Sequence, residues 1–217
     1  MPEAPAPDPA RAAETKGRRT QRRILEAAIA HFAAVGYDRA SVPVIANQVG
    51  VSHSTLYQHF GRKEDLFRAS VQADLSALLS EVSPALESAD PAPDRLAGLL
   101  SGLVALTADH PLARRVLLNL DGDQAEALRD LPALAALEQR LESVVVEGQA
   151  KGALRGDLGP RVTAEGLLTI CLALVAIGIR LEGRDFPRAR AAERFLREAL
   201  AAPSRSHAPD HPAFPIT

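Results

Sequence analysis

Side chains that can form hydrogen bonds are concentrated between Ser52 and His59. Leu56 in this segment and Phe60 directly after it stand four residues apart, which places them on one face of a short helix. The other positions carry hydroxyl, imidazole, amide and phenol groups and almost no charge: His53, Ser54, Thr55, Tyr57, Gln58 and His59. Such groups can bind base edges and phosphate oxygens. We therefore predict that this helix contacts double-stranded DNA. Two side chains have a second interpretation: Tyr57 as a half-buried core aromatic, and His59 as a helix cap or the partner of a buried carbonyl.

The charge distribution along the chain agrees with this prediction. Residues 11–68 contain ten basic and five acidic side chains, whereas residues 69–217 contain 15 basic and 20 acidic ones. A basic segment attracts phosphates, although a solvated charged helix has the same composition. Four of the basic residues, Arg18, Arg19, Arg22 and Arg23, suggest either an arm that contacts DNA or solubilising charge.

The elements around this segment are helices joined by short turns. Apolar residues at helical spacing from Ile24 to Val35 predict an amphipathic helix, with Thr20 as its N-cap and Gly36 at its end. Ser41 can cap a second helix that ends near Gln48, with Pro43 in its first turn. A tight turn at Gly50 and Val51 follows, and Ser52 can cap the third helix. Residues 41–60 thus predict a helix-turn-helix, whose second helix enters the major groove.

The stretch IANQVGVSHSTLYQHFGRKEDLF resembles the signature of the tetracycline-repressor-like (TetR) family, and the match extends over about Thr20 to Phe67. The resemblance implies a DNA-binding surface in which Ser41 and Lys63 contact phosphate, residues 53–55 contact bases, and Tyr57 and His59 contact the backbone. The set of predicted DNA-binding residues is Ser41, Ser52, His53, Ser54, Thr55, Tyr57, His59 and Lys63. Two positions depart from the family pattern: Ser54 stands where the family often has Gly or another small residue, and Pro43 replaces a frequently polar residue and removes one possible contact.

The remainder of the chain predicts an all-α fold. A long helix is expected from Lys63 to Ala89, followed by five helices between Pro or Gly breaks. We predict an N-terminal arm (1–17), a three-helix helix-turn-helix domain for DNA binding (18–68), a larger helical domain for ligand binding and dimerisation (69–202), and a flexible tail (203–217).

A continuous apolar run from Gly166 to Ile179 indicates a helix that is covered on several sides. A second subunit is one cover, and burial within a single chain is the alternative. The family resemblance implies a homodimer through about residues 163–200, so that two DNA-binding domains contact a near-palindromic operator. At about 14 residues, the run is shorter than the roughly 20 that a membrane span needs, so no membrane partner is expected.

The helical body provides mainly apolar material for a ligand site. A hydrophobic or aromatic small-molecule effector is therefore expected. The predicted ligand-binding residues, which cannot be separated from ordinary core and turn residues by sequence, are Leu103, Leu106, His110, Leu117, Asn119, Val144, Thr169 and Cys171. We expect the effector to shift the helix that begins near Lys63 and so to release DNA.

Other function classes have less support. The chain lacks a Gly-x-Ser-x-Gly motif, a phosphate-binding glycine loop and a His-Glu-x-x-His motif, so no enzyme and no catalytic residue is predicted. No cofactor is predicted, and the single Cys171 and the absence of metal-ligand spacing favour a cytoplasmic protein without a metal site. A bacterial transcriptional regulator, most simply a repressor, is the leading interpretation. The alternatives are a helical protein-interaction adaptor and, with less support, a helical enzyme.

Overall fold

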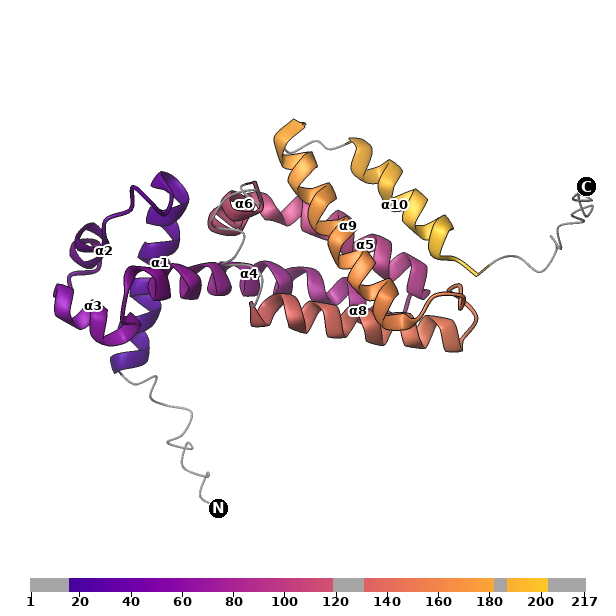
Figure 1. Cartoon of the computed structure of the whole chain (residues 1–217), viewed down its shortest axis with the longest axis horizontal. Coiled ribbons are helices and arrows are strands. Elements are labelled where there is room, and N and C mark those ends of the chain that lie inside the picture. The colour runs from indigo at the N-terminus through magenta and orange to yellow at the C-terminus, as the bar shows by residue number, and fades with distance from the viewer. Residues whose placement is uncertain (1–15, 119–130, 182–186, 203–217) are drawn as a thin grey trace, which may run out of the picture. The chain divides into compact units, whose positions relative to one another are not determined.

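The computed structural model describes residues 16–118, 131–181 and 187–202 (Figure 1). Over these residues the regular structure is helical, and one isolated β-bridge joins Leu154 to Ala201. The predicted all-α fold is confirmed. The helices are α1 (Lys16–Val35), α2 (Val42–Val49), α3 (His53–Phe60), α4 (Lys63–Glu87), α5 (Ala92–Leu106), the short 3₁₀ turn η2 (Thr107–Asp109), α6 (Pro111–Leu118), α8 (Pro132–Ala150), α9 (Pro160–Leu181) and α10 (Pro187–Leu200).

The first of two compact units contains described residues of 1–81 and 106–135. Its core forms where the apolar faces of α1, α2 and α3 meet, and Ile24, Phe32, Ile45 and Leu56 are completely buried there. The Phe32 ring packs edge-on against Phe67 of α4, with 5.1 Å between the ring centroids. These contacts explain the spacing of apolar residues, because each buried side chain falls on the helix face that is turned toward this core.

The ends of α1 show one correct and one wrong prediction. Gly36 follows the helix with φ of 82°, a left-handed conformation that glycine adopts without a Cβ clash. A Cβ at Gly36 would lie 2.6 Å from Nη2 of Arg115. The predicted N-cap at Thr20 is wrong, because α1 begins at Lys16 and Thr20 lies in its second turn. Lys and Arg are good helix formers, so the helix extends upstream through the basic residues.

Helix α6 belongs to the first unit and forms hydrogen bonds with α4 and with α1. The Asp74 carboxylate of α4 accepts hydrogen bonds from the amides of Leu112 (2.9 Å) and Ala113 (2.8 Å) in the first turn of α6. From the other half of α6, Arg115 Nη1 donates to the Ala33 carbonyl in the last turn of α1, at 3.0 Å. The side chain of Asp74 therefore satisfies helix amides that would otherwise lack partners, and Arg115 satisfies a carbonyl at a helix end.

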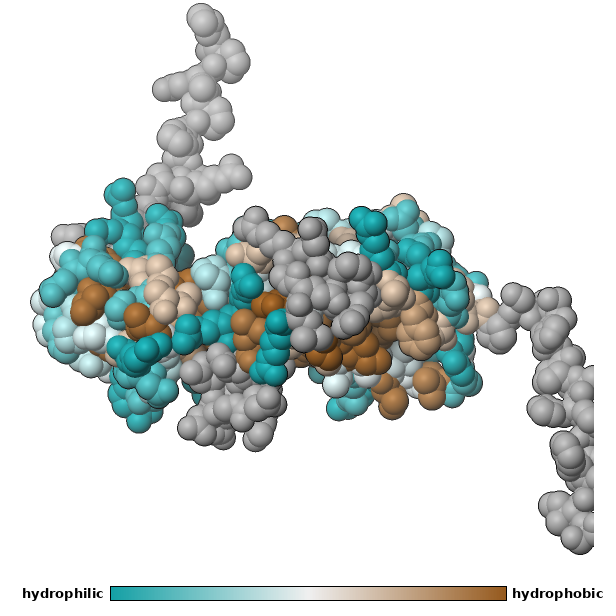
Figure 2. Space-filling model, turned by 90° about the horizontal axis from the view of Figure 1, so that it is seen from above, coloured by the Kyte–Doolittle hydropathy of each residue, from teal (hydrophilic) through white to brown (hydrophobic). Residues whose placement is uncertain are grey.

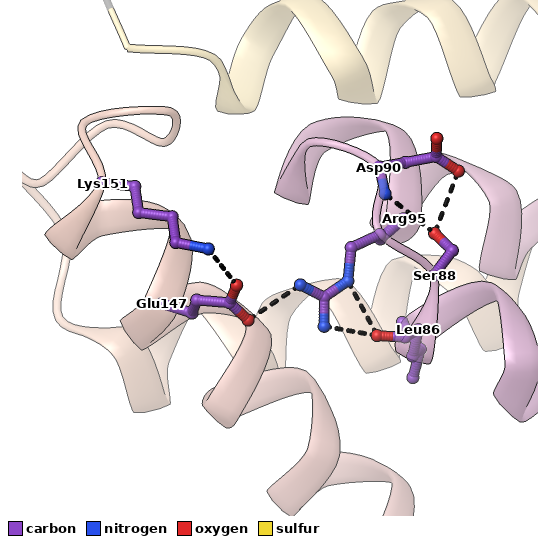
Figure 3. Close-up of polar contacts among 6 residues, drawn as sticks. All are labelled: Leu86, Ser88, Asp90, Arg95, Glu147 and Lys151. Carbon is purple, nitrogen blue, oxygen red and sulfur yellow. Dashed lines mark hydrogen bonds and ion pairs between the residues drawn. The ribbon is translucent and has the colours of Figure 1, made fainter.

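The second unit contains described residues of 82–105 and 136–217, which include the end of α4, most of α5 and α8, and α9 and α10. Figure 3 shows Arg95 of α5 between two partners: its guanidinium donates to the Leu86 carbonyl at the end of α4 and, at 2.8 Å, to Glu147 of α8. Lys151 also donates to Glu147, at 2.6 Å. This network joins three helices of the second unit.

Helix α10 is attached to α5 by polar contacts. Ser101 donates to Glu193 at 2.6 Å, and Arg197 forms an ion pair of 2.6 Å with Asp94. Leu196 is buried on the same side of α10. The units are defined by packing, and the functional domain boundaries expected from the sequence stay predictions.

Helix α9 is longer than the apolar run that predicts it. The most apolar 18-residue window of Pro160–Arg180 has a mean hydropathy of 2.2, and 39% of that window is buried. By length and composition, this helix meets the requirement for crossing a membrane, which the 14-residue run does not. An apolar helix that is covered by protein meets the same requirement, so length and composition do not decide between the two. Some apolar side chains of α9 are nevertheless exposed in the single chain.

Candidate nucleic-acid interface

Helix α3 presents the predicted polar surface. Ser52 is its N-cap, with an extended backbone (φ −71°, ψ 153°), and its hydroxyl accepts a hydrogen bond of 3.1 Å from the Thr55 amide. Leu56 and Phe60 are buried. The opposite side of the helix carries His53, Ser54, Tyr57 and Gln58, which are exposed, and Thr55 and His59, which are half-buried.

The hydroxyl groups at the start of α3 contact one another. Ser52 Oγ lies 2.9 Å from Ser54 Oγ and 2.7 Å from Thr55 Oγ1. Because a hydroxyl has one hydrogen and two lone pairs, the hydroxyls of Ser54 and Thr55 can each bind a further partner, whereas the three contacts of Ser52 use its full capacity. Ser52 thus has a structural role as a cap in addition to its predicted position on the DNA-binding surface.

Tyr57 lies at the surface and not in the core. Its side chain is 38% exposed, and its ring packs edge-on against His53 with 4.9 Å between centroids. The core-aromatic interpretation of Tyr57 is therefore wrong. The His53 contact holds the phenol on the polar face of α3, where its hydroxyl can meet a phosphate or a base.

The start of α2 differs from a usual capped helix. Ser41 occupies the N-cap position with φ of −114° and ψ of 115°, but its side chain makes no cap hydrogen bond. A capping side chain accepts from the second or third helical amide. The second residue here is Pro43, which has no N–H, and the amide of the third, Val44, donates to the Ser41 carbonyl at 3.1 Å. The expected side-chain cap is therefore absent.

The amide of Ser41 has a partner that sequence reasoning missed. It donates to Nε2 of His31 on α1, at 3.2 Å. His31 is half-buried and stands directly before the core residue Phe32. The contact joins residues ten positions apart across a turn, so helical periodicity gives no signal for it.

Lys63 stands at the start of α4 beside Tyr37. Its Nζ lies 4.6 Å from the centre of the Tyr37 ring and donates to the Asp38 carbonyl at 3.3 Å. The Tyr37 hydroxyl donates to Glu64 at 2.7 Å. Burial, together with this hydrogen bond, raises the pKa of Tyr37 to about 12, so its phenol stays protonated. The sequence motif identifies Lys63 but not the ring that holds its side chain.

The basic residues near the N-terminus lie on α1. Arg23 donates through Nη2 to the Val49 carbonyl at the end of α2, at 2.8 Å, and Arg22 lies 3.6 Å from Glu26. Arg18 and Arg19 are exposed on the same helix. The four arginines are thus part of α1, and contact of these side chains with DNA, like the alternative of solubilising charge, stays a prediction.

The predicted ligand-binding residues are distributed over both units. In the first unit, His110 and Leu117 are buried and Leu106 is half-buried. His110 Nδ1 lies 3.2 Å from the Asp74 carboxylate. Asn119 lies outside the described residues.

In the second unit, Leu103, Val144 and Cys171 are buried, and burial raises the pKa of the Cys171 thiol to about 11. Thr169 is on the exposed side of α9, and its hydroxyl donates to the Glu165 carbonyl at 2.9 Å. Ligand binding by any of these residues stays a prediction.

The segment that contains the polar helix α3 is similar to a known protein family. Residues 24–70 match the family model described as bacterial regulatory proteins, tetR family. This segment contains α2, α3 and most of α1, and it extends into α4. The matched residues include all the predicted DNA-binding positions.

Similarity to individual proteins extends beyond this segment. The HTH-type transcriptional regulator UidR of Escherichia coli is 26% identical over 195 residues, which are 86% of this chain and 94% of UidR. The HTH-type transcriptional repressor KstR2 of Mycolicibacterium smegmatis is 29% identical over 62% of this chain and 67% of its own length. The structure of FadR from Bacillus subtilis in complex with stearoyl-CoA has the same fold, with a TM-score of 0.68 and 22% identity over 83% of this chain and 97% of FadR.

Proposed function

Since this chain is a DNA-binding transcriptional regulator of the TetR family, we propose that it represses transcription from a near-palindromic operator and is released by a small, mainly apolar effector. The observation that carries the proposal is the surface of α3. A short helix with two buried anchors, Leu56 and Phe60, exposes hydroxyl, imidazole, amide and phenol groups in place of the usual charged solvent face. KstR2, one of the relatives, is named a repressor.

In this proposal, different residues of the first unit contact different parts of the DNA. Side chains at the N-terminal end of α3, His53, Ser54 and Thr55, contact base edges. Tyr57 and His59 contact the sugar-phosphate backbone, and Ser41 and Lys63 contact phosphates from the starts of α2 and α4. A protein with this task acts in the cytoplasm, where a bacterium keeps its chromosome.

The proposal includes a homodimer formed through α9 and α10. Exposed apolar side chains recur along one side of α9, with Val162 at 62%, Ile170 at 45% and Ile177 at 46% exposure, and Phe195 of α10 is 69% exposed. In the space-filling view of Figure 2, apolar residues, coloured brown, lie at the molecular surface. Large apolar side chains gathered on one surface favour contact with protein. A second copy of the chain would cover them and would provide the second DNA-binding domain that a palindrome requires.

The effector is proposed by chemical class only. Buried residues of the helical body are predominantly Leu, Val and Ala, so a site formed among them would recognise apolar surface and would fix the orientation of the ligand with few polar groups. Because an effector can change DNA binding only through different affinities for two conformations, it must bind more tightly to the form that does not fit the operator.

The test is a DNA-binding measurement with selected duplexes. The full chain is used to enrich duplexes from a random-sequence library, and the affinity for the enriched duplex is then measured over a series of salt concentrations. We expect an enriched sequence with near two-fold symmetry and a steep loss of affinity with salt. Recovery of random sequences, with equal affinity for all of them, would contradict the proposed function.

A further inference from the structure

We propose that His31 is a positioning residue for DNA binding: its ring fixes the start of α2 so that the Ser41 hydroxyl is free to contact phosphate. This inference rests on the proposed function, because it adds a residue to the same DNA-binding surface. The observation that carries it is the hydrogen bond of 3.2 Å from the Ser41 amide to His31 Nε2.

The two serine N-caps of the helix-turn-helix differ in how their hydroxyls are used. Ser52 accepts from the Thr55 amide, so its hydroxyl is committed to the start of α3. Ser41 makes no cap bond, because Pro43 has no N–H and the Val44 amide donates to the Ser41 carbonyl. The Ser41 hydroxyl thus does not cap α2 and can form a hydrogen bond with a ligand.

A hydroxyl without a cap bond needs another means of orientation. The backbone of Ser41 is held on both sides: its carbonyl accepts from the amides of Val44 (3.1 Å) and Ile45 (3.3 Å), and its amide donates to His31. The carbonyl contacts belong to α2 itself. The His31 contact is different, since it connects the start of α2 to α1, and so it sets where the Ser41 hydroxyl lies relative to the rest of the DNA-binding unit.

The role requires a particular state of the ring. To accept a hydrogen bond, Nε2 must carry no proton, so the neutral ring has its proton on Nδ1. An apolar side chain of similar size could fill the same space but could not accept from the Ser41 amide. Glutamine has an acceptor oxygen at about the same reach and should replace the ring in this respect.

The experiment is a double-mutant cycle on operator affinity, measured with the duplex enriched by the wild-type chain. We expect His31→Leu and Ser41→Ala each to weaken binding about fivefold, in line with loss of one neutral hydrogen bond. Because His31 acts through Ser41, the double variant should also be weaker by about fivefold, whereas independent effects would multiply to about 25-fold. His31→Gln should bind within about twofold of wild type.

The control cycle pairs His31→Leu with Tyr57→Phe on α3. No contact joins Tyr57 to His31 or to Ser41 among those described, so these two effects should multiply. Thermal unfolding of every variant separates a loss of fold from a loss of affinity. Multiplying effects of His31→Leu and Ser41→Ala, or unchanged affinity in His31→Leu, would overturn the proposal.

A second measurement needs no variant. In the wild-type chain labelled with ¹⁵N-histidine, the ring of His31 should be the tautomer with the proton on Nδ1. A proton on Nε2 at neutral pH would overturn the inference. If the wild-type chain enriches no duplex at all, the proposed function fails, and this outcome is distinct from either result of the cycle.

Discussion

At the scale of single residues, the DNA-binding surface depends on side chains that are held by neighbours outside the sequence motif. Lys63 extends over the ring of Tyr37, and Tyr57 packs against His53. Such contacts reduce the conformational entropy that each side chain loses on binding. The motif therefore identifies the groups that contact DNA, whereas tertiary structure determines how well they are placed.

Substitution of Lys63 should reveal its contact with phosphate. In Lys63→Ala, one positive charge is lost, so the slope of log affinity against log salt should become less steep by about 0.9, and binding should weaken similarly for all sequences. Lys63→Arg keeps the charge and is the matched control, with an unchanged slope expected. Titration of the enriched duplex at four or more salt concentrations measures both variants, and equal slopes for Lys63→Ala and wild type would contradict the predicted role.

The sequence predicts several side chains of this surface but not the residues that hold them in place. His53, Ser54 and Tyr57 are exposed on a helix, as their positions off the face of Leu56 and Phe60 predict. His31 and Tyr37 were missed because their roles arise from contacts between residues 10 to 27 positions apart. Local patterns carry no information about such pairs, and a histidine or tyrosine beside a core residue has many possible roles.

At the scale of elements, most helix positions follow from local sequence. Ser and Gly flank α2 and α3, and Pro begins α6 and α8, because these residue types have defined roles at helix ends. The prediction of Thr20 as a cap is wrong because a good capping residue can also lie inside a helix when good helix formers precede it.

The two serine caps should contribute differently to stability. Ser52→Ala removes a side-chain cap and should lower the free energy of unfolding by about 1 kcal/mol. Ser41→Ala is the matched control: it removes no cap bond and should change stability by less than about 0.5 kcal/mol. Urea unfolding followed by circular dichroism measures both, and equal losses in the two variants would count against the assignment of the caps.

The contact network of Arg95, Glu147 and Lys151 should make stability depend on pH. Hydrogen bonds from Lys151 and then Arg95 lower the pKa of Glu147 from 4.5 to about 2. A carboxyl group with a lowered pKa in the folded state stabilises the fold above its unfolded pKa, and this contribution is lost as pH falls from about 4.5 toward about 2.

The variant Glu147→Gln tests this dependence. The difference in unfolding free energy between wild type and Glu147→Gln should be greatest above pH 4.5 and should shrink as the pH is lowered toward 2. Chemical unfolding at a series of pH values measures the difference directly. A difference that stays constant over this range would show that the Glu147 charge makes no net contribution.

At the scale of the whole molecule, the exposed apolar residues of α9 and α10 should determine the oligomeric state. Phe195→Glu introduces a charge at a side chain that is 69% exposed in the single chain, so the fold should tolerate it. In the proposed dimer this charge would be buried, and the variant should sediment as a monomer. Since two linked DNA-binding domains gain avidity, operator affinity should fall by about 100-fold or more.

The matched control is Val146→Glu, which makes the same change at another exposed apolar residue, on α8. It lies outside the proposed contact surface and should remain a dimer with normal operator affinity. Sedimentation velocity with both variants distinguishes the two surfaces. A dimer that survives Phe195→Glu and dissociates in Val146→Glu would place the subunit contact on α8 instead.

The two compact units alternate along the chain, and this limits where the chain can be cut without breaking a unit. Residues 82–105 belong to one unit, yet both flanking stretches, within 1–81 and 106–135, belong to the other. Shortening the chain after residue 81, where the first stretch of this unit ends, would remove Arg115 from the Ala33 carbonyl and leave the buried Asp74 without its two amide donors. A chimaera that takes its second unit from a relative must therefore replace two separate stretches, 82–105 and 136–217. The first replacement needs a junction on each side of 82–105, and the second needs one more junction after residue 135.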